Sequence, residues 1–479
     1  MLYSIMLRLL SYYVFFILAA LPCVLTAQEC EWLETGKGSG VERTYDIAVD
    51  NNNNYFVVAD FSSTFTISNF SKTYVFTKTV GGSGFNGLLI KYNKDGEIKW
   101  ASQSTISSST ASCSYVSAAT DAASNVYVLA RYYNTVNFGG SFSLTNNYAP
   151  LVNCALIKYD SSGTIQWVKD IGPISNAGTL GPSSIVVDNQ NNIVVGFSFR
   201  GDIGFSGTTQ TLNTSSSPLQ QNIGMIKYNP SGAFIKAINY GAITANDIFE
   251  KMAVDATNNL YILYDARTIS TSISYSDTGI KILKTDSALN PSDSVKFFNN
   301  TNTRAIGITA TPSGSPIVTG FFRDTVNFGG IGLKAVSSLV LKSNSFIVYF
   351  DKNLSPVWAK NDVPSANGVA QPAGGIDIRN GFIYLGGILQ LGSTSFGSIS
   401  VPYVPSSFNM YAVKMDTLGN FLWAFSSGVA GGTTTTTSLA ADVEGNGVIT
   451  GRFTSKVTVF NIADTSNYTS ENFFYCQNS

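Results

Sequence analysis

The sequence predicts an all-β fold: a seven-bladed β-propeller of four-stranded blades, forming one domain over residues 28–479. Two observations lead to this prediction. A pattern of short β-rich runs and polar turns recurs along the chain, and all five tryptophans occupy one position of that pattern. Four-stranded repeats that bury their faces against their neighbours form a ring. Outside the N-terminal segment we find no convincing helical period.

Two features of the chain fix the register of the repeat. Tryptophans follow an Asn or Asp by seven residues and are expected on the last strand of a unit; they are Trp100, Trp167, Trp358 and Trp423. The first strand of a unit ends at an acidic turn, or at Thr311 in one unit; the acidic residues are Asp50, Asp121, Asp188, Asp255, Asp377 and Asp442. Seven units follow, spaced 56 to 71 residues apart.

For the acidic turns and for the tryptophans, a structural role is favoured over a binding role. Asp and Asn turn the chain by bonding their own backbone. The run that begins at Asp50 resembles a calcium loop, but Tyr55 and Phe61 stand where such a loop needs a glycine and a carboxylate. The tryptophans are expected to pack between units; a sugar-stacking platform is the alternative.

The second unit shows the four predicted strands most clearly, at about 115–120, 126–132, 155–159 and 165–168. Val, Ile, Tyr, Phe and Trp fill these runs, while Asp, Asn, Ser and Gly fill the gaps, as strands and turns require. The hexamer Thr-Val-Asn-Phe-Gly-Gly at 135–140 recurs at 325–330. Unit four, at about 248–298, lacks Trp and the turn glycine, so its strand limits are the least defined.

The two ends of the chain are predicted to close the ring. Trp32 is a last-strand residue with no earlier strands in its unit, and the unit that begins near Ser438 shows only three strands. The N-terminal strand should therefore complete the last blade. Cys30 precedes Trp32 by two residues, and aligning Cys476 with Tyr159 places the two cysteines opposite each other. A disulfide there would stabilise the fold by roughly 4–5 kcal/mol in the chain-entropy model.

The other two cysteines after the signal segment are Cys113 and Cys154, at the entries to the first and third strands of unit two. An even number of cysteines in an exported chain favours disulfides. A bridge between these two needs their loops to bend inward, because the second strand lies between them and the Cα atoms must come within about 7 Å. Free thiols are the alternative for both pairs.

The N-terminal segment, residues 1–27, has the features of a secretory signal peptide. Arg8 precedes an apolar run from Leu9 to about Leu21, and Ala27-Gln28 is a plausible cleavage point. A transmembrane anchor is the alternative, but the run is short for the roughly 20 residues that span a bilayer. We therefore expect an exported protein, secreted, at the cell surface or periplasmic, without a membrane span once the signal is removed.

The units resemble the β-propeller repeats of the SBBP type found in exported bacterial proteins. The segments that carry the likeness are N-V-Y-V at 125–128, P-I-V-T-G at 316–320, I-K-Y-D at 157–160 and the turn pattern Gly-x-x-x-Trp. The likeness covers essentially all of residues 28–479. It implies a propeller fold and export. It implies no catalytic residues, because that family has no agreed catalytic set.

Charge is scarce and is predicted to gather on one face. Lys and Arg total 29, Asp and Glu total 30, and the formal net charge is −1. Four units carry a charge at the end of the second strand: Asp60, Arg131, Asp265 and Arg452. The loops that enter the first strands add Glu42, Arg43, Asp247, Glu250 and Arg304 on the same face. These nine residues form a candidate binding face; the alternative is a solvated rim with weak surface pairs.

Composition excludes several classes of function. A near-neutral chain without basic runs is a poor candidate for nucleic-acid binding, which relies on clustered Lys and Arg. The sequence has no histidine, which excludes Ser-His-Asp relays and His-ligated metals. We predict no cofactor, metal or catalytic residue, and the sequence does not indicate an oligomeric state.

Three functional hypotheses remain. The first is a non-enzymatic binding, adhesion or scaffold module that presents one face to an extracellular protein or glycan. The alternative is a carboxylate-dependent, glycosidase-like enzyme, which needs two acids about 5–10 Å apart. The third is a purely structural surface protein. Two carboxylates converging on the ring axis would favour the enzyme, and a flat face with exposed aromatics would favour binding.

Overall fold

The computed structural model shows an all-β chain: each element in its described part is a strand, from β1 (Gly36–Gly38) to β42 (Phe474–Asn478). Within that part, the structure has no helix with the length and apolar character needed to span a membrane. The segment predicted to be a signal peptide, and Cys30, lie outside it. The structure describes residues 32, 34–69, 72–78, 80–214, 221–241, 245–268, 279–298, 303–335, 343–365, 368–405, 408–428, 432–454, 457–460, 465–468 and 474–478.

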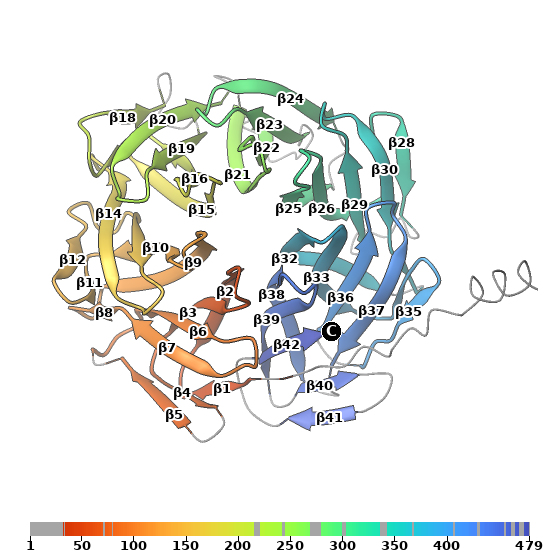
Figure 1. The fold of residues 1–479 in the computed structure, drawn as a ribbon, viewed down its shortest axis with the longest axis horizontal. Coiled ribbons are helices and arrows are strands. Elements are labelled where there is room, and N and C mark those ends of the chain that lie inside the picture. The colour runs from red at the N-terminus through yellow and green to blue at the C-terminus, as the bar shows by residue number, and fades with distance from the viewer. Residues whose placement is uncertain are drawn as a thin grey trace, which may run out of the picture.

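Antiparallel sheets stand around a central axis, and the strands of each sheet follow one another in chain order apart from the hairpins inserted between them (Figure 1). Unit 1 contains β2 (Glu42–Val49), β3 (Tyr55–Phe61), β6 (Asn86–Tyr92) and β7 (Ile98–Gln103). Unit 2 contains β9 (Ser112–Thr120), β10 (Val126–Tyr133), β13 (Asn153–Tyr159) and β14 (Ile165–Pro173). Unit 3 contains β15 (Thr179–Val187), β16 (Ile193–Arg200), β19 (Asn222–Tyr228) and β20 (Phe234–Tyr240).

The remaining sheets continue the same order around the axis. Unit 4 contains β21 (Ala245–Val254), β22 (Leu260–Thr268), β23 (Gly279–Thr285) and β24 (Pro291–Phe298). Unit 5 contains β25 (Arg304–Ala310), β26 (Pro316–Phe322), β29 (Asn344–Phe350) and β30 (Pro356–Asn361). Unit 6 contains β32 (Val369–Arg379), β33 (Phe382–Gln390), β36 (Asn409–Asp416) and β37 (Phe421–Ser427). In unit 7, β38 (Thr433–Ala441) pairs with β39 (Gly447–Thr454), which in turn pairs with β42.

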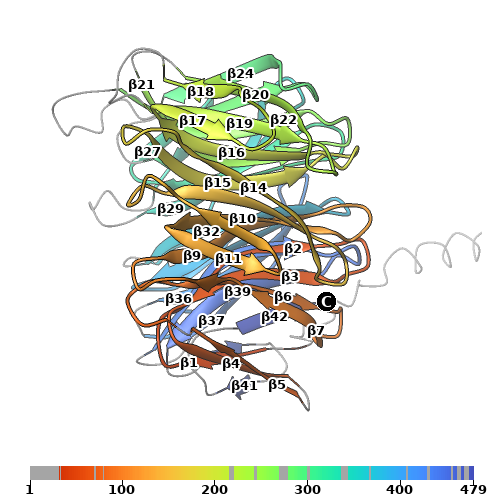
Figure 2. The ribbon, with the colours of Figure 1, turned by 90° about the vertical axis from the view of Figure 1, so that its left-hand side faces the viewer.

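The first strand of each unit lies nearest the axis and the last lies outermost, which is the arrangement of a β-propeller (Figures 1 and 2). The predicted strands of unit 2 are confirmed, and each is somewhat longer than predicted. Tyr159 faces Ile165 across the last hairpin, as the predicted symmetric turn requires. The fold therefore follows the local alternation of apolar runs and turns.

The hydrophobic core is divided among the interfaces between neighbouring sheets. One buried cluster joins Phe56, Val58 and Leu89 of unit 1 to Tyr115 and Val128 of unit 2. Most second strands are buried on both faces, because each sheet is covered by a neighbour on either side. This explains the near-continuous apolar runs that the sequence shows at these positions.

The repeated tryptophan and lysine residues bind the next unit at the turn between its third and fourth strands. Trp100 Nε1 and Lys91 Nζ both donate to the carbonyl oxygen of Ser161, at 3.0 Å each. Trp167 and Lys158 share the carbonyl oxygen of Pro230 in the same way. The predicted packing role of these tryptophans is confirmed. It also gives the Ile-Lys-Tyr repeat a structural reason.

Trp32 makes the equivalent contact with unit 1. Its indole Nε1 donates to the carbonyl oxygen of Lys94 at 3.1 Å, and its ring packs on Tyr55 and Tyr92. Its ring also lies against Gly96, as that of Trp100 lies against the turn glycine of unit 2. Trp32 therefore occupies the seam position of a last strand.

Hairpins that the sequence analysis did not predict fill the connection between the second and third strands. They are β4–β5 (Thr64–Asn69, Lys72–Thr77), β11–β12 (Thr135–Gly139, Phe142–Thr145), β17–β18 (Asp202–Phe205, Thr211–Asn213), β27–β28 (Thr325–Phe328, Ile331–Lys334), β34–β35 (Thr394–Phe396, Ile399–Val401) and β40–β41 (Val457–Phe460, Thr465–Tyr468). The recurring hexamer forms the first strand and turn of two of these hairpins. It is therefore a structural signature.

Most of these hairpins pair with the end of the preceding unit. β11 pairs with β8 (Thr105–Ile106), which follows β7, while β17 pairs with β14 and β34 with β31 (Val363–Pro364). β1, which follows Trp32, pairs with β4 in the same manner. These hairpins form an outer belt, and those that pair in this way link their unit to the segment before it, whereas β27–β28 forms a sheet of its own.

The acidic turns between first and second strands bond their own backbone, as predicted. Asp50 Oδ1 accepts hydrogen bonds from the N–H groups of Asn52 and Asn54, at 2.9 and 2.8 Å. The assignment of Asp377 to such a turn was wrong. Asp377 pairs with Tyr384 inside the sheet, because unit 6 uses a shorter turn at Asn380.

The predicted alignment of Cys476 was wrong by two residues. Cys476 pairs with Ile449, which is the place that Ile157 takes in unit 2. Asn478 takes the place of Tyr159. With this register, Cys476 does not stand directly opposite the position predicted for Cys30. A bridge would need a shift of about two residues along one of the strands.

Candidate functional site

Three residues of the predicted charged face come together at the seam of units 1 and 2. Arg43 Nε and Nη2 donate to the two carboxylate oxygens of Asp60 at 2.9 and 2.6 Å, and the Asp60 side chain is fully buried. The Tyr45 hydroxyl donates to the same carboxylate at 3.0 Å and accepts from Arg131 at 3.1 Å. Burial and the Asp60 charge raise the pKa of Tyr45. Asp60 is therefore an internal anchor, stronger than a solvated surface pair.

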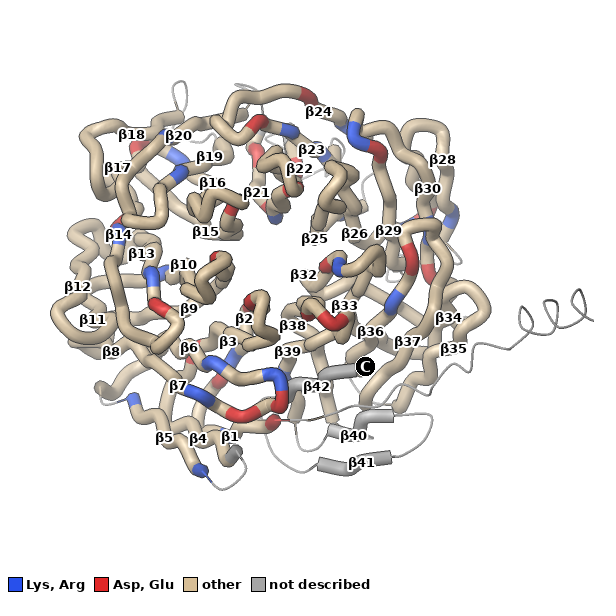
Figure 3. The backbone as a smooth tube through the Cα atoms, in the orientation of Figure 1, with Lys and Arg blue, Asp and Glu red and all other residues tan. Residues whose placement is uncertain are grey.

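The other six residues of the predicted set differ in burial and pairing. Arg304 pairs with Glu250 at 3.1 Å, and its side chain is 48% exposed. Asp247 is buried, with the Lys281 ammonium 3.8 Å away. Two further acids are buried and one arginine is exposed: Glu42, Asp265 and Arg452. Charged residues are scattered thinly along the chain (Figure 3). The structure thus pairs or buries most of the predicted set.

Cys113 and Cys154 are separate, buried thiols. Cys113 pairs across the sheet with Tyr132, whereas Cys154 pairs with Arg131. Successive residues of a strand point to opposite faces, so the two thiols lie on opposite faces and in different apolar clusters. The bridge considered for these cysteines is therefore not formed. Burial raises the pKa of the Cys113 thiol to about 12.

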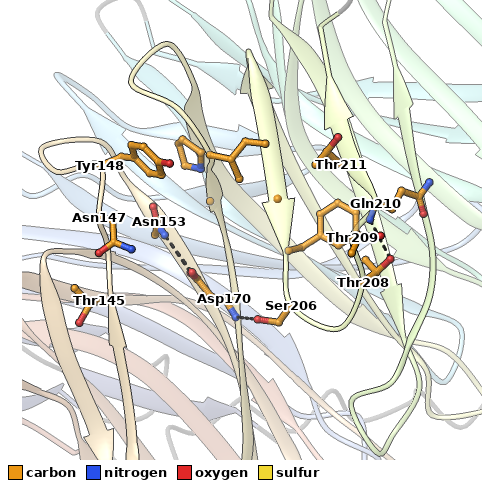
Figure 4. Close-up of a pocket in the computed structure, with 15 residues that line it drawn as sticks. Thr145, Asn147, Tyr148, Asn153, Asp170, Ser206, Thr208, Thr209, Gln210 and Thr211 are labelled. Carbon is orange, nitrogen blue, oxygen red and sulfur yellow. Dashed lines mark hydrogen bonds between the residues drawn. The ribbon is translucent and has the colours of Figure 1, made fainter.

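A hollow of about 350 Å³, here called the peripheral hollow, opens between the outer hairpins of units 2 and 3 (Figure 4). The loop after β12, the β17–β18 hairpin and the end of β14 form its walls. These segments belong to the face on which the sequence placed binding. Its polar lining consists of Thr145, Asn147, Tyr148, Asn153, Asp170, Ser206, Thr208, Thr209, Gln210 and Thr211.

Asp170 and Asn153 lie side by side in this hollow and are held by hydrogen bonds. The Asp170 carboxylate accepts hydrogen bonds from the Tyr132 hydroxyl at 2.7 Å and from Asn153 Nδ2 at 3.1 Å. Its backbone N–H donates to Ser206 Oγ at 2.9 Å. Burial raises the pKa of Asp170. Asn153 Oδ1 is buried and receives no hydrogen bond within the described residues.

The sequence analysis missed the asparagine at this position, although the repeat contains a signal for it. An asparagine begins the third strand in five units: Asn86, Asn153, Asn222, Asn344 and Asn409. Four of these units also contain the Ile-Lys-Tyr pattern or its looser copy. In each of the four, the asparagine lies six residues before the last residue of that pattern. The role of Asp170 had no such signal, because its partners come from β10, β13 and the turn after β17.

A second hollow, of about 300 Å³, lies on the axis where the first strands meet; we call it the axial hollow. Each first strand carries a β-bulge at one equivalent position. A bulge re-aims the side chains that follow it. The residues just after the bulges line the hollow: Asp46, Ser117, Ser184, Lys251, Gly307, Ile376 and Ser438.

Two carboxylates also line the axial hollow. Asp46 accepts from the hydroxyls of Ser117 and Ser438 at 2.7 and 2.8 Å, which ties units 1, 2 and 7 together. Asp377 accepts from the N–H of Ala441 at 2.8 Å. Burial raises the pKa of Asp377, and the Asp46 charge adds to the shift. Both acids therefore act as links between neighbouring first strands.

Comparison with known proteins gives no family. No family model matches the sequence, and no curated protein matches it. The structure is similar to a virginiamycin B lyase from Staphylococcus aureus, at 9% identity and a TM-score of 0.41 over 93% of this chain and 98% of that one. It is also similar to a protein of unknown function from Dyadobacter fermentans, at 10% identity and a TM-score of 0.40 over 76% of this chain and 93% of that one. A gluconolactonase from Xanthomonas campestris matches at 8% identity and a TM-score of 0.32, over 94% and 89%. Similarity at this level supports no inference about activity.

Proposed function

We propose that this chain is an exported, non-enzymatic β-propeller that binds a glycan at the peripheral hollow. The observation that carries the proposal is the lining of that hollow. Neutral hydroxyl and amide groups surround it, together with the ring of Tyr148. Sugars present many hydroxyl donors and an apolar ring face, so this chemistry suits them. The composition of the N-terminal segment supports export.

A binding function fits the peripheral hollow better than catalysis does. Acid-base hydrolysis of a glycosidic bond uses two carboxyl groups about 5–10 Å apart. Asp170 is the only carboxylate among the described residues that line this hollow. It already accepts hydrogen bonds from Tyr132 and Asn153, so its role is structural. The peripheral hollow therefore favours recognition.

The test is glycan-array binding by the mature protein, followed by variants of the hollow. Tyr148→Ala and Gln210→Ala should each lower the affinity for the best glycan at least fivefold. Tyr133→Ala, which removes a tyrosine outside the lining, is the matched control and should bind as the wild type does. Capture of a protein by this face, without any glycan binding, would instead support the protein-partner alternative and overturn the glycan proposal.

An enzymatic function is the second candidate, and it rests on the axial hollow. Asp46 and Asp377 both line that hollow, and the raised pKa of Asp377 suits a proton donor. Four hydrogen bonds to Asp46 weigh against it as a base. Hydrolysis of a panel of chromogenic glycosides by the wild type, lost in Asp377→Asn, would support the enzyme. A lack of turnover across the panel would leave binding as the function.

We also propose that units 1 to 7 are the seven blades of a closed ring, with the N-terminal segment completing unit 7. The support is that Trp32 and β1 contact unit 1 as last-strand residues contact the next unit elsewhere. Trp32→Ala should then cost about 3 kcal/mol in unfolding free energy. Trp100→Ala, at the equivalent seam, is the matched control and should cost a similar amount. A cost near zero for Trp32→Ala alone would contradict closure.

The clasp between Cys30 and Cys476 is a proposal of its own. It would link the two ends of the chain at the last blade. Peptide mapping of the mature protein without reductant should recover the two cysteines in one cross-linked peptide. Recovery of both as free thiols would remove the clasp and leave closure to strand pairing alone.

A further inference from the structure

The turns between first and second strands are hydrogen-bonded to one another around the face opposite the hairpin loops. These contacts, 2.7 to 3.2 Å long, join Asn380 to Val443, Val443 to Asn53, Asn52 to Ser124, Ala122 to Asn191, Asn189 to Asn258 and Ala256 to Pro312. They connect units 6, 7, 1, 2, 3, 4 and 5 in that order. Between the described turn residues of units 5 and 6 there is no such bond.

The interruption follows from the short turn of unit 6. Asn380 and Gly381 have φ angles of 52° and 79°, which is the two-residue turn of a tight hairpin. The other units use a longer turn, which begins at the acidic residue or, in unit 5, at Thr311. In unit 4 this residue is Asp255. The shorter turn does not reach Pro312 and Ser313 of unit 5. A hollow of about 920 Å³, here called the junction hollow, opens at this place.

The junction hollow is continuous with the axial hollow. Ile308, Ile376, Asp377 and Arg379 line both. Apolar side chains such as Ile308 and Ile378 form part of the wall, and polar ones such as Ser313 and Asn189 form the rest. A volume of this size falls in the range of small-molecule sites, which is about 300–1,000 Å³.

The acids and the cations of this space differ in how they are bonded. Three acids line the two hollows, and all accept hydrogen bonds: Asp377 from two backbone N–H groups, Asp255 from the backbone of its own turn, and Asp46 from two hydroxyls and two backbone N–H groups. The cations are Arg379, which lines both hollows, and Lys251, which lines the axial hollow. Neither forms an ion pair within 4 Å among the described residues, although the Arg379 charge favours the ionised form of Asp377 and so lowers its pKa.

We propose that the junction hollow binds a small molecule carrying an oxyanion, a carboxylate or a phosphate, with Arg379 as its main partner. A guanidinium offers a planar fork of donors that matches such groups. Lys251 lies further along the axis and supplies a second positive charge to an extended ligand. The inference is independent of glycan binding at the peripheral hollow, because the two hollows share no residue.

Calorimetric titration tests the proposal with glucuronate, glucose 6-phosphate and neutral glucose on the mature protein at low ionic strength. The two anions separate the carboxylate source from the phosphate source, and glucose is the neutral control. At least one anion should bind, and glucose should bind at least tenfold more weakly. Added salt should weaken the binding, because it screens partly exposed charges.

Variants then assign the binding to this hollow. Arg379→Gln should raise the Kd at least tenfold, and Arg379→Lys, which keeps the charge but loses the fork, should raise it by less. Lys251→Gln should have a smaller effect. Lys334→Gln, at an exposed lysine of β28 outside both proposed sites, should change nothing. Equal binding of glucose and the anions, no binding of either anion at millimolar concentration, or an unchanged Kd in both Arg379 variants would overturn the proposal.

Discussion

The peripheral and axial hollows contrast in how they are built. The peripheral hollow lies between loops that differ from unit to unit, and neutral groups line it around Asp170, the one carboxylate among its described lining residues. The axial hollow is lined by one repeated position that different residue types fill, among them Lys251 and Asp46. The repeat therefore fixes where side chains stand around the axis, whereas the loops that connect the strands determine which chemical groups line the peripheral hollow.

Asp170, which is hydrogen-bonded in the peripheral hollow, and Lys251, which forms no ion pair among the described residues, should respond differently to mutation. The largest loss of stability is expected at Asp170. Asp170→Ala leaves the Tyr132 hydroxyl and the Asn153 amide without their acceptor in a largely buried site. The loss of unfolding free energy should be about 3 kcal/mol. Lys251→Met, in the axial hollow, should stay within about 0.5 kcal/mol of the wild type. Urea unfolding at pH 7 measures both, and equal losses would erase the contrast.

The packing beneath the peripheral hollow should also be intolerant of added volume. A Cβ atom on Gly172 would overlap the carboxamide of Asn153, so Gly172→Ala should cost about 1–2 kcal/mol. Gly332 in β28 has open space at the same atom, and Gly332→Ala should not destabilise the fold. Thermal unfolding of the two variants compares them directly. An unchanged melting temperature for Gly172→Ala would mean that Asn153 can move to make room for the added atom.

The smallest effect is expected from pH. Burial raises the pKa of Asp170 above its usual value of 3.8, so the folded state binds this proton more tightly than the unfolded chain does. The contribution of this group to stability therefore falls as the pH rises from about 4 through the raised pKa. Asp170→Asn should flatten that part of the stability curve, measured by unfolding between pH 3.5 and 7. A decline of the same steepness in the variant would assign it to other acids.

The local pattern predicted much of the fold and little of the site. Strand limits in unit 2 and the turn role of Asp50 are set by neighbours in sequence, so alternation and turn chemistry were sufficient. The pairing of Asp60 with Arg43 and Tyr45 joins adjacent strands of unit 1, and it depends on a strand register that the sequence analysis did not predict. The hairpin belt was missed because its strands are short, although the repeated hexamer marked two of its members.

What the sequence by itself determined is the repeat: the period, the last-strand tryptophans and the seam role of Trp32, because each depends on local alternation of apolar and turn residues. Only the tertiary structure decided which side chains meet. One extra residue at a bulge turns the following side chain toward the axis, as at Lys251, and a shorter turn at Asn380 opens a hollow. Both effects arise because a shift of one residue moves a side chain to the other face of a strand, and the neighbour that it then meets lies far away in sequence.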